Sequence, residues 1–245
     1  MAKDRFENKV VLITGGNSGI GLAAAKRVAS EGGKVIVTGR DAEKLKKAVQ
    51  EIGSNAQGIV ADIAKLSDLD ALYAEIKTKY GRLDGLFANA GVAIMEPLEQ
   101  VTEKNVDTLM DTNFKGTFFT LQKAIPLFSK GAHVVLNASV ADTKGSVPMA
   151  VYGATKAAVR SMARTFSAHL LPQEVRVNVV SPGPIETAIW GGVDAAGITA
   201  RAAAVPSKRF GTPEEVAGAV AYLLSDEASY IIGAELYVDG GVSQL

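Results

Sequence analysis

The chain has 245 residues, of which 47% are hydrophobic and 21% charged, the composition of a globular protein long enough to bury one large core. Its Lys+Arg count of 26 equals its Asp+Glu count, so net charge gives no reason to expect nucleic acid or a membrane as a partner. The absence of cysteine excludes disulfides and thiolate metal sites, and with only His133 and His169 a three-histidine centre is impossible, so we predict no metal site.

Short β-branched runs alternate with longer segments of helical period along the chain. This alternation is typical of an α/β fold, and we predict a single Rossmann-type domain over residues 1–245, a doubly wound sheet of about seven parallel strands with helices on both faces. The predicted strands are 9–14, 34–38, 56–61, 85–88, 132–138, 175–180 and 235–238. The predicted helices are 20–30, 42–52, 67–80, 103–128, 152–171 and 214–224.

Local signals mark several helix ends. The Gly32-Gly33 pair should stop the first helix, Ser67 with Asp70 resembles a capping box, and Thr212-Pro213 reads as a cap followed by a first-turn proline. Residues 1–8 contain no apolar run and the longest apolar stretch, 216–224, is too short to span a membrane. We therefore expect a soluble, cytoplasmic protein.

Residues 182–211 break the alternation, because they are rich in Gly, Ala and Pro and show no clear period. Connectors of this length are usually functional or disordered. We favour a mobile cover over a substrate pocket, and an unstructured excursion is the alternative.

A glycine-rich segment, TGGNSGIG at 14–21, joins the first strand to the first helix. Glycines here let the backbone approach a pyrophosphate, whose charge is met by the helix N-terminus. The spacing departs from the usual G-x-G-x-x-G, and a tight turn without a ligand is the alternative. The predicted dinucleotide contacts are Gly15, Asn17, Ser18, Gly19, Ile20 and Gly21.

The end of the second strand should determine which dinucleotide binds. An acidic residue there would accept hydrogen bonds from an NAD ribose, but the chain has Arg40, whose guanidinium suits a 2′-phosphate. We therefore favour NADP(H), with NAD(H) possible; the alternative is a surface Arg40 paired with Asp41 or Glu43. Asp62 and Ile63, after the third strand, are further cofactor candidates, although Asp62 serves equally well as a cap of the following turn.

Tyr152 and Lys156 are four residues apart, which places both side chains on one helical face. A phenol titrates near ~10, so bringing its pKa near neutrality needs roughly 4 kcal/mol from neighbouring positive charge. Ser139 follows a strand on the side where parallel sheets bind ligands. Asn113 interrupts a helix, where its polar side chain favours a local bend. A buried tyrosine with an exposed lysine would be the ordinary alternative.

Jointly these segments resemble the classical short-chain dehydrogenase/reductase family over essentially the whole chain. The matching segments are TGGNSGIG at 14–21, ANAG at 88–91, Asn113, Ser139, YGATK at 152–156 and SPGPIET at 181–187. The resemblance implies a seven-stranded parallel sheet, a nicotinamide cofactor and a catalytic set of Asn113, Ser139, Tyr152 and Lys156. Ala88 stands where the usual motif, NNAG, has its first asparagine.

The resemblance also implies how the cofactor and the subunits are arranged. Asn89, Ala90 and Gly91 should lie near the dinucleotide, Lys156 should bind its ribose, and Pro182, Gly183, Ile185 and Thr187 should lie around the nicotinamide. A homotetramer is implied, with helices 103–128 and 152–171 pairing across one two-fold axis and the last helix and strand across another.

We therefore predict an NADP(H)-dependent carbonyl reductase or alcohol dehydrogenase with Tyr152 as general acid and base. Its small-molecule substrate would be a ketone, aldehyde or secondary alcohol, neutral and partly apolar because few charges are placed to meet a carboxylate. The predicted substrate pocket comprises Ser139, Ala141, Met149, Tyr152, Gly183 and Trp190, with Ile185 and Ile189 beside Trp190, although Trp190 serves equally well in the core or a subunit contact. Alternatives are an NAD-dependent alcohol dehydrogenase and a non-catalytic dinucleotide sensor.

Overall fold

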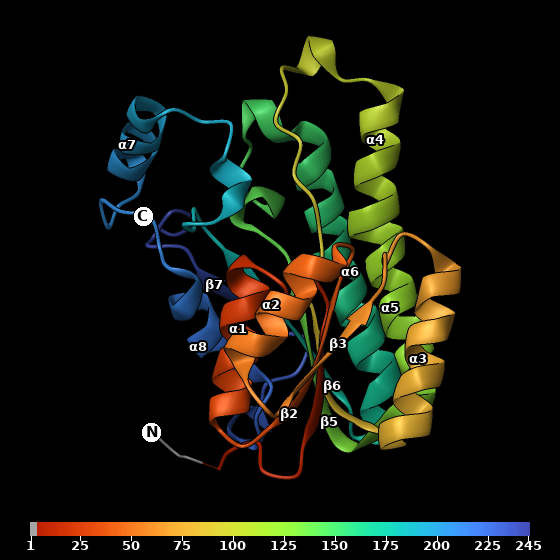
Figure 1. Cartoon of the computed structure of the whole chain (residues 1–245). Helices are drawn as coiled ribbons and strands as arrows, with labels where there is room; N and C mark the ends of the chain where they lie inside the picture. The colour runs from red at the N-terminus through yellow and green to blue at the C-terminus, as the bar shows by residue number, and fades with distance from the viewer. Residues whose placement is uncertain (1–3) are drawn as a thin grey trace.

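A sheet of seven parallel strands lies at the centre of the computed structural model, which describes residues 4–245 (Figure 1). The strands run in the order β3-β2-β1-β4-β5-β6-β7, so the direction of winding reverses between β1 and β4. In open α/β sheets, ligands bind beyond the carboxyl ends of the strands at this reversal. The strands are β1 (Val10–Ile13), β2 (Lys34–Gly39), β3 (Ala56–Val60), β4 (Leu83–Ala88), β5 (Phe128–Asn137), β6 (Arg176–Pro182) and β7 (Glu235–Val238).

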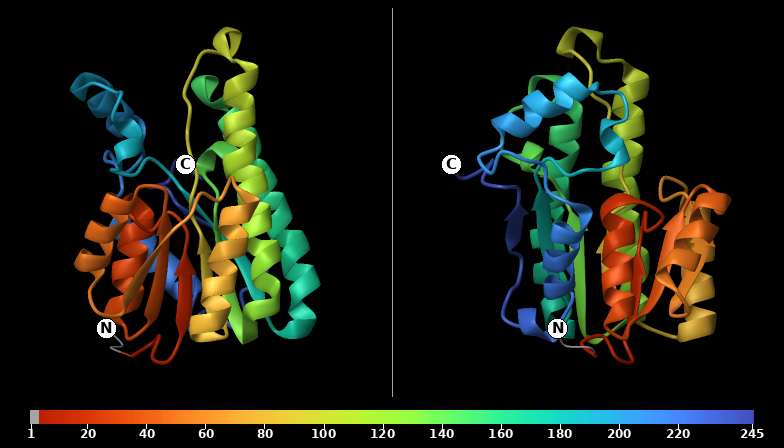
Figure 2. Two further views of the ribbon diagram at one scale, coloured as in Figure 1. Left: turned by 45° about the vertical axis from the view of Figure 1, so that its right-hand side comes forward. Right: turned by 60° about the vertical axis from the view of Figure 1, so that its left-hand side comes forward.

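Helices cover both faces of the sheet (Figure 2). One face packs against α3 (Leu66–Tyr80), α5 (Thr117–Ala124) and α6 (Ala150–Leu170), and the other against α1 (Gly19–Ser30), α2 (Ala42–Ile52) and α8 (Pro213–Leu223). On α6 the buried positions Val159, Ala163, Phe166 and Leu170 recur at the helical period, which presents one apolar stripe to the sheet. The predicted doubly wound α/β fold is confirmed.

The predicted helix 103–128 is wrong in its continuity and in its end. The chain forms α4 (Glu103–Leu109), a π-helical segment at Met110–Gly116, then α5 and a 3₁₀ turn at Ile125–Leu127, and β5 already begins at Phe128. Pro126 lies in that turn and has no N–H to continue a helix. The wider π-helical turns carry Asn113, the residue expected to bend this helix.

Residues 182–211 are not an unstructured excursion. They contain a 3₁₀ turn at Ala188–Trp190 and the helix α7 (Ala195–Ala204), which begins where the Asp194 carboxylate accepts a hydrogen bond from Gly197 N at 2.7 Å. No residue of α7 is buried, so the helix shows no apolar period by which it could be recognised. It stands beyond the carboxyl ends of the strands, on the same side as the start of α4 (Figures 1 and 2).

Two of the three predicted helix-end signals are confirmed. Gly32 has a φ of +90° and its N–H bonds to Ala29 O, which ends α1. Thr212 caps α8 in a complete capping box with Glu215. Within residues 4–245, no helix combines the length and apolar character that crossing a lipid bilayer requires.

The capping box predicted from Ser67 and Asp70 is wrong. The helix α3 begins at Leu66, before Ser67, and its N-cap position is Lys65, without a side-chain cap. The Asp68 carboxylate instead accepts a hydrogen bond from Asp62 N at 3.0 Å, which ties the helix start to the end of β3.

Candidate active site

The glycine-rich loop after β1 adopts a conformation that excludes side chains at several positions. Gly15 and Gly19 have φ values of +65° and +51°, in the region that favours glycine. A Cβ at Gly21 would lie 2.3 Å from Gly15 O. Thr14 Oγ1 accepts hydrogen bonds at 3.0 Å from the backbone N–H groups of Asn89 and Ala90, so the loop is fastened to the end of β4.

The N-terminus of α1 opens from this loop with its first amides uncapped. The exposed Ser18 occupies the N-cap position and its side chain makes no cap hydrogen bond, and the first turn contains no acidic residue. Free N–H groups and the positive end of the helix dipole form an anion site. These residues therefore fit the diphosphate of a dinucleotide.

Arg40 lies exposed at the end of β2, and it forms no ion pair with any carboxylate in the described part of the chain, so the predicted alternative pairing with Asp41 or Glu43 is absent. The Asp41 carboxylate caps α2 by accepting a hydrogen bond from Lys44 N at 3.0 Å, and this backbone bond lowers its pKa. A Cβ at Gly39 would lie 2.8 Å from Cγ of Asn17, so Asn17 rests directly on the strand end that leads to Arg40.

Asp62 and Ile63 follow β3. Asp62 Oδ1 accepts a hydrogen bond from Ala64 N at 3.1 Å, the turn-capping arrangement expected as one of its two alternatives. The Ile63 side chain is buried, and a Cβ at Gly116 would lie 3.0 Å from it. Only the backbone of Ile63 is therefore left to meet a ligand.

Asn89 joins the carboxyl ends of three neighbouring strands. Its Nδ2 donates to Thr14 O at 3.0 Å, and its Oδ1 accepts from Asn137 Nδ2 at 2.9 Å. The side chain thus braces β1, β4 and β5 together. Gly91 lies nearer the reactive groups, because a Cβ there would be 3.5 Å from Lys156 Nζ.

Tyr152, Lys156 and Ser139 converge at the carboxyl end of β5. Lys156 Nζ lies 5.6 Å from the centroid of the Tyr152 ring and donates to Asn137 O at 2.7 Å. Ser139 lies beside Tyr152 and lowers the pKa of its hydroxyl, and both side chains line the same cavity. Lys156 is 4% exposed, and a buried ammonium with three donor hydrogens and one protein acceptor leaves donors for ligand hydroxyl groups.

Burial sets the protonation of this cluster. It raises the pKa of Tyr152 above its usual value, against the hydrogen bond from Ser139, which lowers it. Burial also lowers the pKa of Lys156 to about 8. The expected depression of the Tyr152 pKa by Lys156 is thus not present in the protein alone, because the loss of water around the buried phenol raises its pKa and outweighs the groups that lower it.

Asn113 is buried in the π-helical segment and uses its amide within the protein. Its Oδ1 accepts from Val92 N at 2.8 Å, and its Nδ2 donates to Val92 O at 2.9 Å and to Thr155 Oγ1 at 3.1 Å. Thr155 Oγ1 in turn donates to Tyr152 O at 2.7 Å. Sequence reasoning missed Thr155, although its place between Tyr152 and Lys156 on the inner face of one helix could have indicated it.

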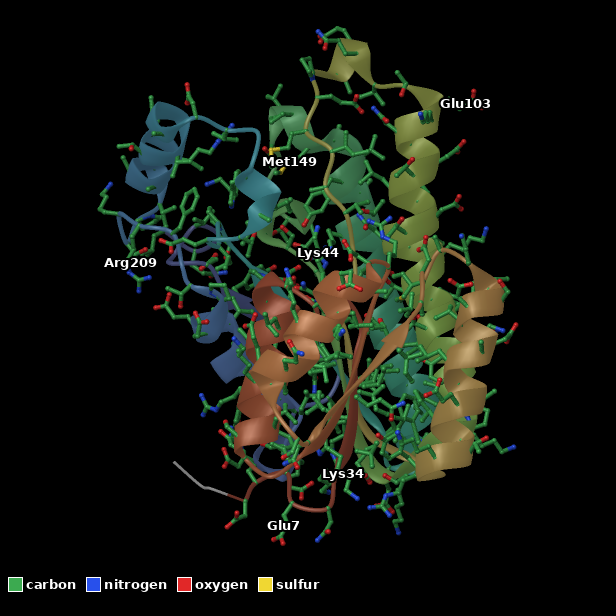
Figure 3. The ribbon with its side chains drawn as sticks, viewed as in Figure 1. Glu7, Lys34, Lys44, Glu103, Met149 and Arg209 are labelled. Carbon is green, nitrogen blue, oxygen red and sulfur yellow. The ribbon has the colours of Figure 1, made fainter. Side chains whose placement is uncertain are left out.

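A cavity of about 360 Å³ opens beside these groups. The six predicted pocket residues, Ser139, Ala141, Met149, Tyr152, Gly183 and Trp190, all line it. Trp190 Nε1 donates to Ile185 O at 2.8 Å, and its ring lies 5.2 Å from that of Phe210. Trp190 is therefore a wall of the cavity that is fixed in place by the segment before α7. Met149 lies above the strand ends, between α7 and α4 (Figure 3).

The segment after β6 connects the cavity to the glycine-rich loop. Pro182, Gly183, Ile185 and Thr187 all line the cavity. A Cβ at Gly183 would lie 2.7 Å from Asp239 Cα, and one at Gly19 would lie 3.2 Å from Thr187 Cγ2. The expected dinucleotide and substrate residues therefore share one continuous region.

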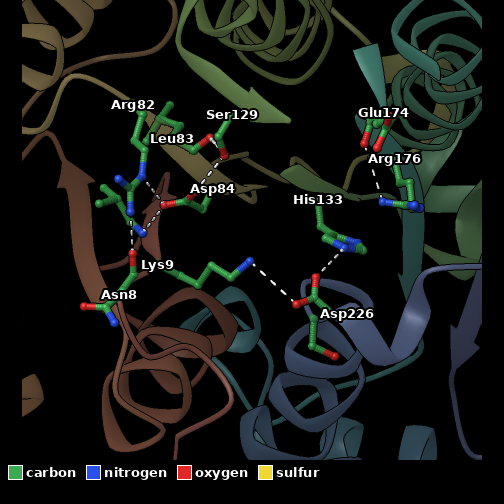
Figure 4. Close-up of polar contacts among 12 residues, drawn as sticks. Asn8, Lys9, Arg82, Leu83, Asp84, Ser129, His133, Glu174, Arg176 and Asp226 are labelled. Atoms are coloured by element: carbon green, nitrogen blue, oxygen red, sulfur yellow. Dashed lines mark hydrogen bonds and ion pairs between the residues drawn. The ribbon is translucent and has the colours of Figure 1, made fainter. Parts of the chain in front are cut away.

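His133 lies too far along the sheet to act as a base for Ser139. His133 lies in the middle of β5, paired with Arg176 at the amino end of β6, and its Nε2 is 3.5 Å from the Asp226 carboxylate, which also lies 3.6 Å from Lys9 Nζ (Figure 4). Burial lowers the pKa of His133. Ser139 lies beyond the carboxyl end of the same strand, so His133 and Ser139 form no nucleophilic triad.

Comparisons with known proteins agree with this architecture. A family model described as enoyl-(acyl carrier protein) reductase matches residues 15–243. Oxidoreductase asL5 of Sarocladium schorii is 40% identical over 100% of this chain and 99% of its own length. The 3-oxoacyl-[acyl-carrier-protein] reductase MabA of Mycobacterium bovis is 35% identical over 98% of this chain and 95% of its own.

A solved structure shares the fold as well. The 3-ketoacyl-(acyl-carrier-protein) reductase from Brucella melitensis complexed with NADH superposes with a TM-score of 0.90 at 33% identity, covering 97% of this chain and 99% of that one. With a matching family model and full-length relatives, the chain belongs to the short-chain dehydrogenase/reductase family of oxidoreductases.

Proposed function

We propose that the protein is an NADP(H)-dependent oxidoreductase that interconverts a ketone or aldehyde and the corresponding alcohol. The observation that carries this proposal is the convergence of Tyr152, Lys156 and Ser139 beside a cavity that continues to the uncapped N-terminus of α1. A bound nicotinamide supplies or accepts the hydride. A protein that only sensed the dinucleotide would have no need of the three side chains together.

Each reactive side chain has a separate task in this proposal. Tyr152 donates a proton to the carbonyl oxygen in reduction and accepts it in oxidation, while Ser139 donates a hydrogen bond to the same oxygen. Lys156 binds the ribose through the ammonium donors that Asn137 O leaves free. Asn113 holds a water of the proton relay; because both amide hydrogens are already donated, the acceptor for that water is its main-chain carbonyl oxygen or the remaining lone pair of its side-chain oxygen.

The direction of the Tyr152 pKa shift predicts how the two reactions depend on pH. Burial raises this pKa, so near neutrality the phenol is the protonated acid that reduction needs. Oxidation needs the phenolate base. Alcohol oxidation should therefore reach its maximum at higher pH than carbonyl reduction.

Tyr152→Phe tests the catalytic assignment. Loss of the acidic hydroxyl should lower kcat for carbonyl reduction by on the order of 10²–10⁴-fold, the usual contribution of a general acid. The affinity for NADPH, measured by calorimetry, should stay close to that of the wild type. Retained turnover in a ketone and aldehyde panel would refute the role of Tyr152.

Arg40→Asp tests the proposed preference for NADP(H). Arg40 is unpaired within the described residues, and the neighbouring Asp41 is committed to capping α2, so the guanidinium is free for a 2′-phosphate. Replacing it should weaken NADPH binding on the order of 10- to 100-fold, with a smaller effect on NADH. Lys47→Asp, the same charge change on the exposed face of α2, serves as the control.

A preference for NAD(H) is the second candidate, because the Brucella reductase was solved with NADH. Titration of both cofactors against the wild type distinguishes the two. If wild type and Arg40→Asp had the same ratio of NADPH to NADH affinity, another residue would select the cofactor.

We further propose a cytoplasmic homotetramer in which residues 182–211 cover the substrate. Exposed apolar side chains near the β7 edge, Tyr230, Ile232 and Leu236, support burial of this edge against another subunit. The position of α7 beside the cavity supports the covering role, since Ala204 and Arg201 line the cavity.

A further inference from the structure

The cavity beside Tyr152 is bordered by charge of one sign. Lys144 and Arg201 are its charged lining residues, and no described aspartate or glutamate belongs to its wall. The neighbouring cleft under α7 differs, because Lys26, Glu186 and Glu214 line it together. The charged residues of the substrate cavity are therefore all positive, and the rest of its wall is largely apolar.

Neither cation is neutralised by the protein. Both side chains are exposed, and within residues 4–245 neither forms an ion pair with a carboxylate. Charges of one sign beside low-dielectric walls focus the field and raise the local concentration of counter-ions. An anion at this cavity would meet two positive charges and no negative one.

Both side chains are also held in place by contacts at their ends. Lys144 Nζ donates to Val242 O at 3.3 Å, and the Arg201 guanidinium lies 5.6 Å from the centroid of the Trp190 ring. A guanidinium stacked on an aromatic face keeps its N–H fork free for a carboxylate or phosphate. These contacts already restrict the two side chains, so binding an anion costs less of their conformational entropy.

We propose that Lys144 and Arg201 bind an anionic group, a carboxylate or a phosphate ester, on the substrate whose carbonyl lies at Tyr152. The proposal rests on the function proposed above and specifies its substrate class: carbonyl compounds with an apolar body and an acidic group. It replaces the expectation of a neutral substrate. The sequence did not suggest this pair, because residues 144 and 201 are far apart in the chain and the helix that carries Arg201 could not be recognised from the sequence.

Binding of three matched eight-carbon probes tests the proposal without requiring turnover. Octanoate, octyl phosphate and octanamide are titrated by calorimetry into the full-length protein saturated with NADP⁺. We expect the anions to bind on the order of 10- to 100-fold more tightly than the amide, as for a charge-assisted hydrogen bond. The stronger of the two anions identifies carboxylate or phosphate as the preferred group.

Lys144→Gln, Arg201→Gln and the double variant should each reduce this preference, and the double variant should abolish it. Lys208→Gln is the matched control, because Lys208 is also exposed and also donates to a backbone carbonyl, Ala203 O at 3.0 Å, but does not line the cavity. It should leave the preference unchanged. Circular dichroism confirms that each variant is folded.

The result that would overturn the inference is an amide that binds as tightly as the anions, or a preference that survives in the double variant. Kinetics with oxo-carboxylates of increasing length and their methyl esters separates this failure from failure of the proposed function. Turnover without preference for the acid overturns the substrate class alone. Anion preference without turnover of any carbonyl compound supports the anion site and overturns the proposed carbonyl reduction.

Discussion

At the scale of single residues, Asp142 is a carboxyl group in an unusual place. Its side chain is 0% exposed and lies 3.9 Å from Arg160 Nε, while Arg160 Nη1 lies 3.5 Å from Glu235 Oε2. Burial, together with the Glu235 carboxylate, raises the pKa of Asp142 to about 7. Its charge also raises the pKa values of Tyr152 and Lys156, so Asp142 is coupled to the reactive pair.

Asp142→Asn should change how stability depends on pH. The folded protein keeps the proton on Asp142 up to about pH 7, whereas the unfolded chain releases it near 3.8. Wild-type stability therefore falls as pH rises between these values, because the unfolded state binds fewer protons. The variant lacks this loss, so its free energy of unfolding relative to wild type should be greater at pH 8 than at pH 5.

Urea unfolding at the two pH values measures this difference. Asp111→Asn provides the control, because Asp111 is an exposed partner of Lys115 at 3.4 Å and surface pairs contribute little. A difference between Asp142→Asn and wild type that is the same at both pH values would show that Asp142 is ionised in the folded protein.

At the scale of elements, the start of α6 must lie close to the 3₁₀ turn at Val140–Asp142 that follows Ser139. Gly153 permits this approach, because a Cβ there would lie 2.6 Å from Ala141 O. The glycine between Tyr152 and Lys156 is thus needed for packing. It brings the helix that carries the phenol against the turn that carries the hydroxyl.

Gly153→Ala should therefore displace the turn and damage catalysis. We expect a loss of about 1–3 kcal/mol of stability, as for other overpacked positions, with a lower kcat and an NADPH affinity that changes less. Thermal unfolding and steady-state kinetics measure both. Gly218→Ala in α8, where a Cβ meets nothing within 4 Å, should instead stabilise the protein by about 0.4–1 kcal/mol; matching effects at the two sites would contradict the packing argument.

At the scale of the whole molecule, the spacing of apolar residues predicted the buried strands and helices, because burial of one or both faces is what produces that spacing. Strands and helices were found in their predicted chain order. Ser139 and Pro182 line one cavity, and Asn89 reaches the same strand ends through its bond to Asn137. Exposed elements carry no such signal, so α7 was missed. Asp142 was missed because its neighbours Arg160 and Glu235 come from other elements.

Trp190 is the only tryptophan in the chain, and it lies in the wall of the cavity between Phe210 and Arg201. No indole elsewhere in the core adds background to its emission. The intrinsic fluorescence of the unmodified protein is therefore a local optical signal, which reports changes at this wall of the cavity without any attached dye.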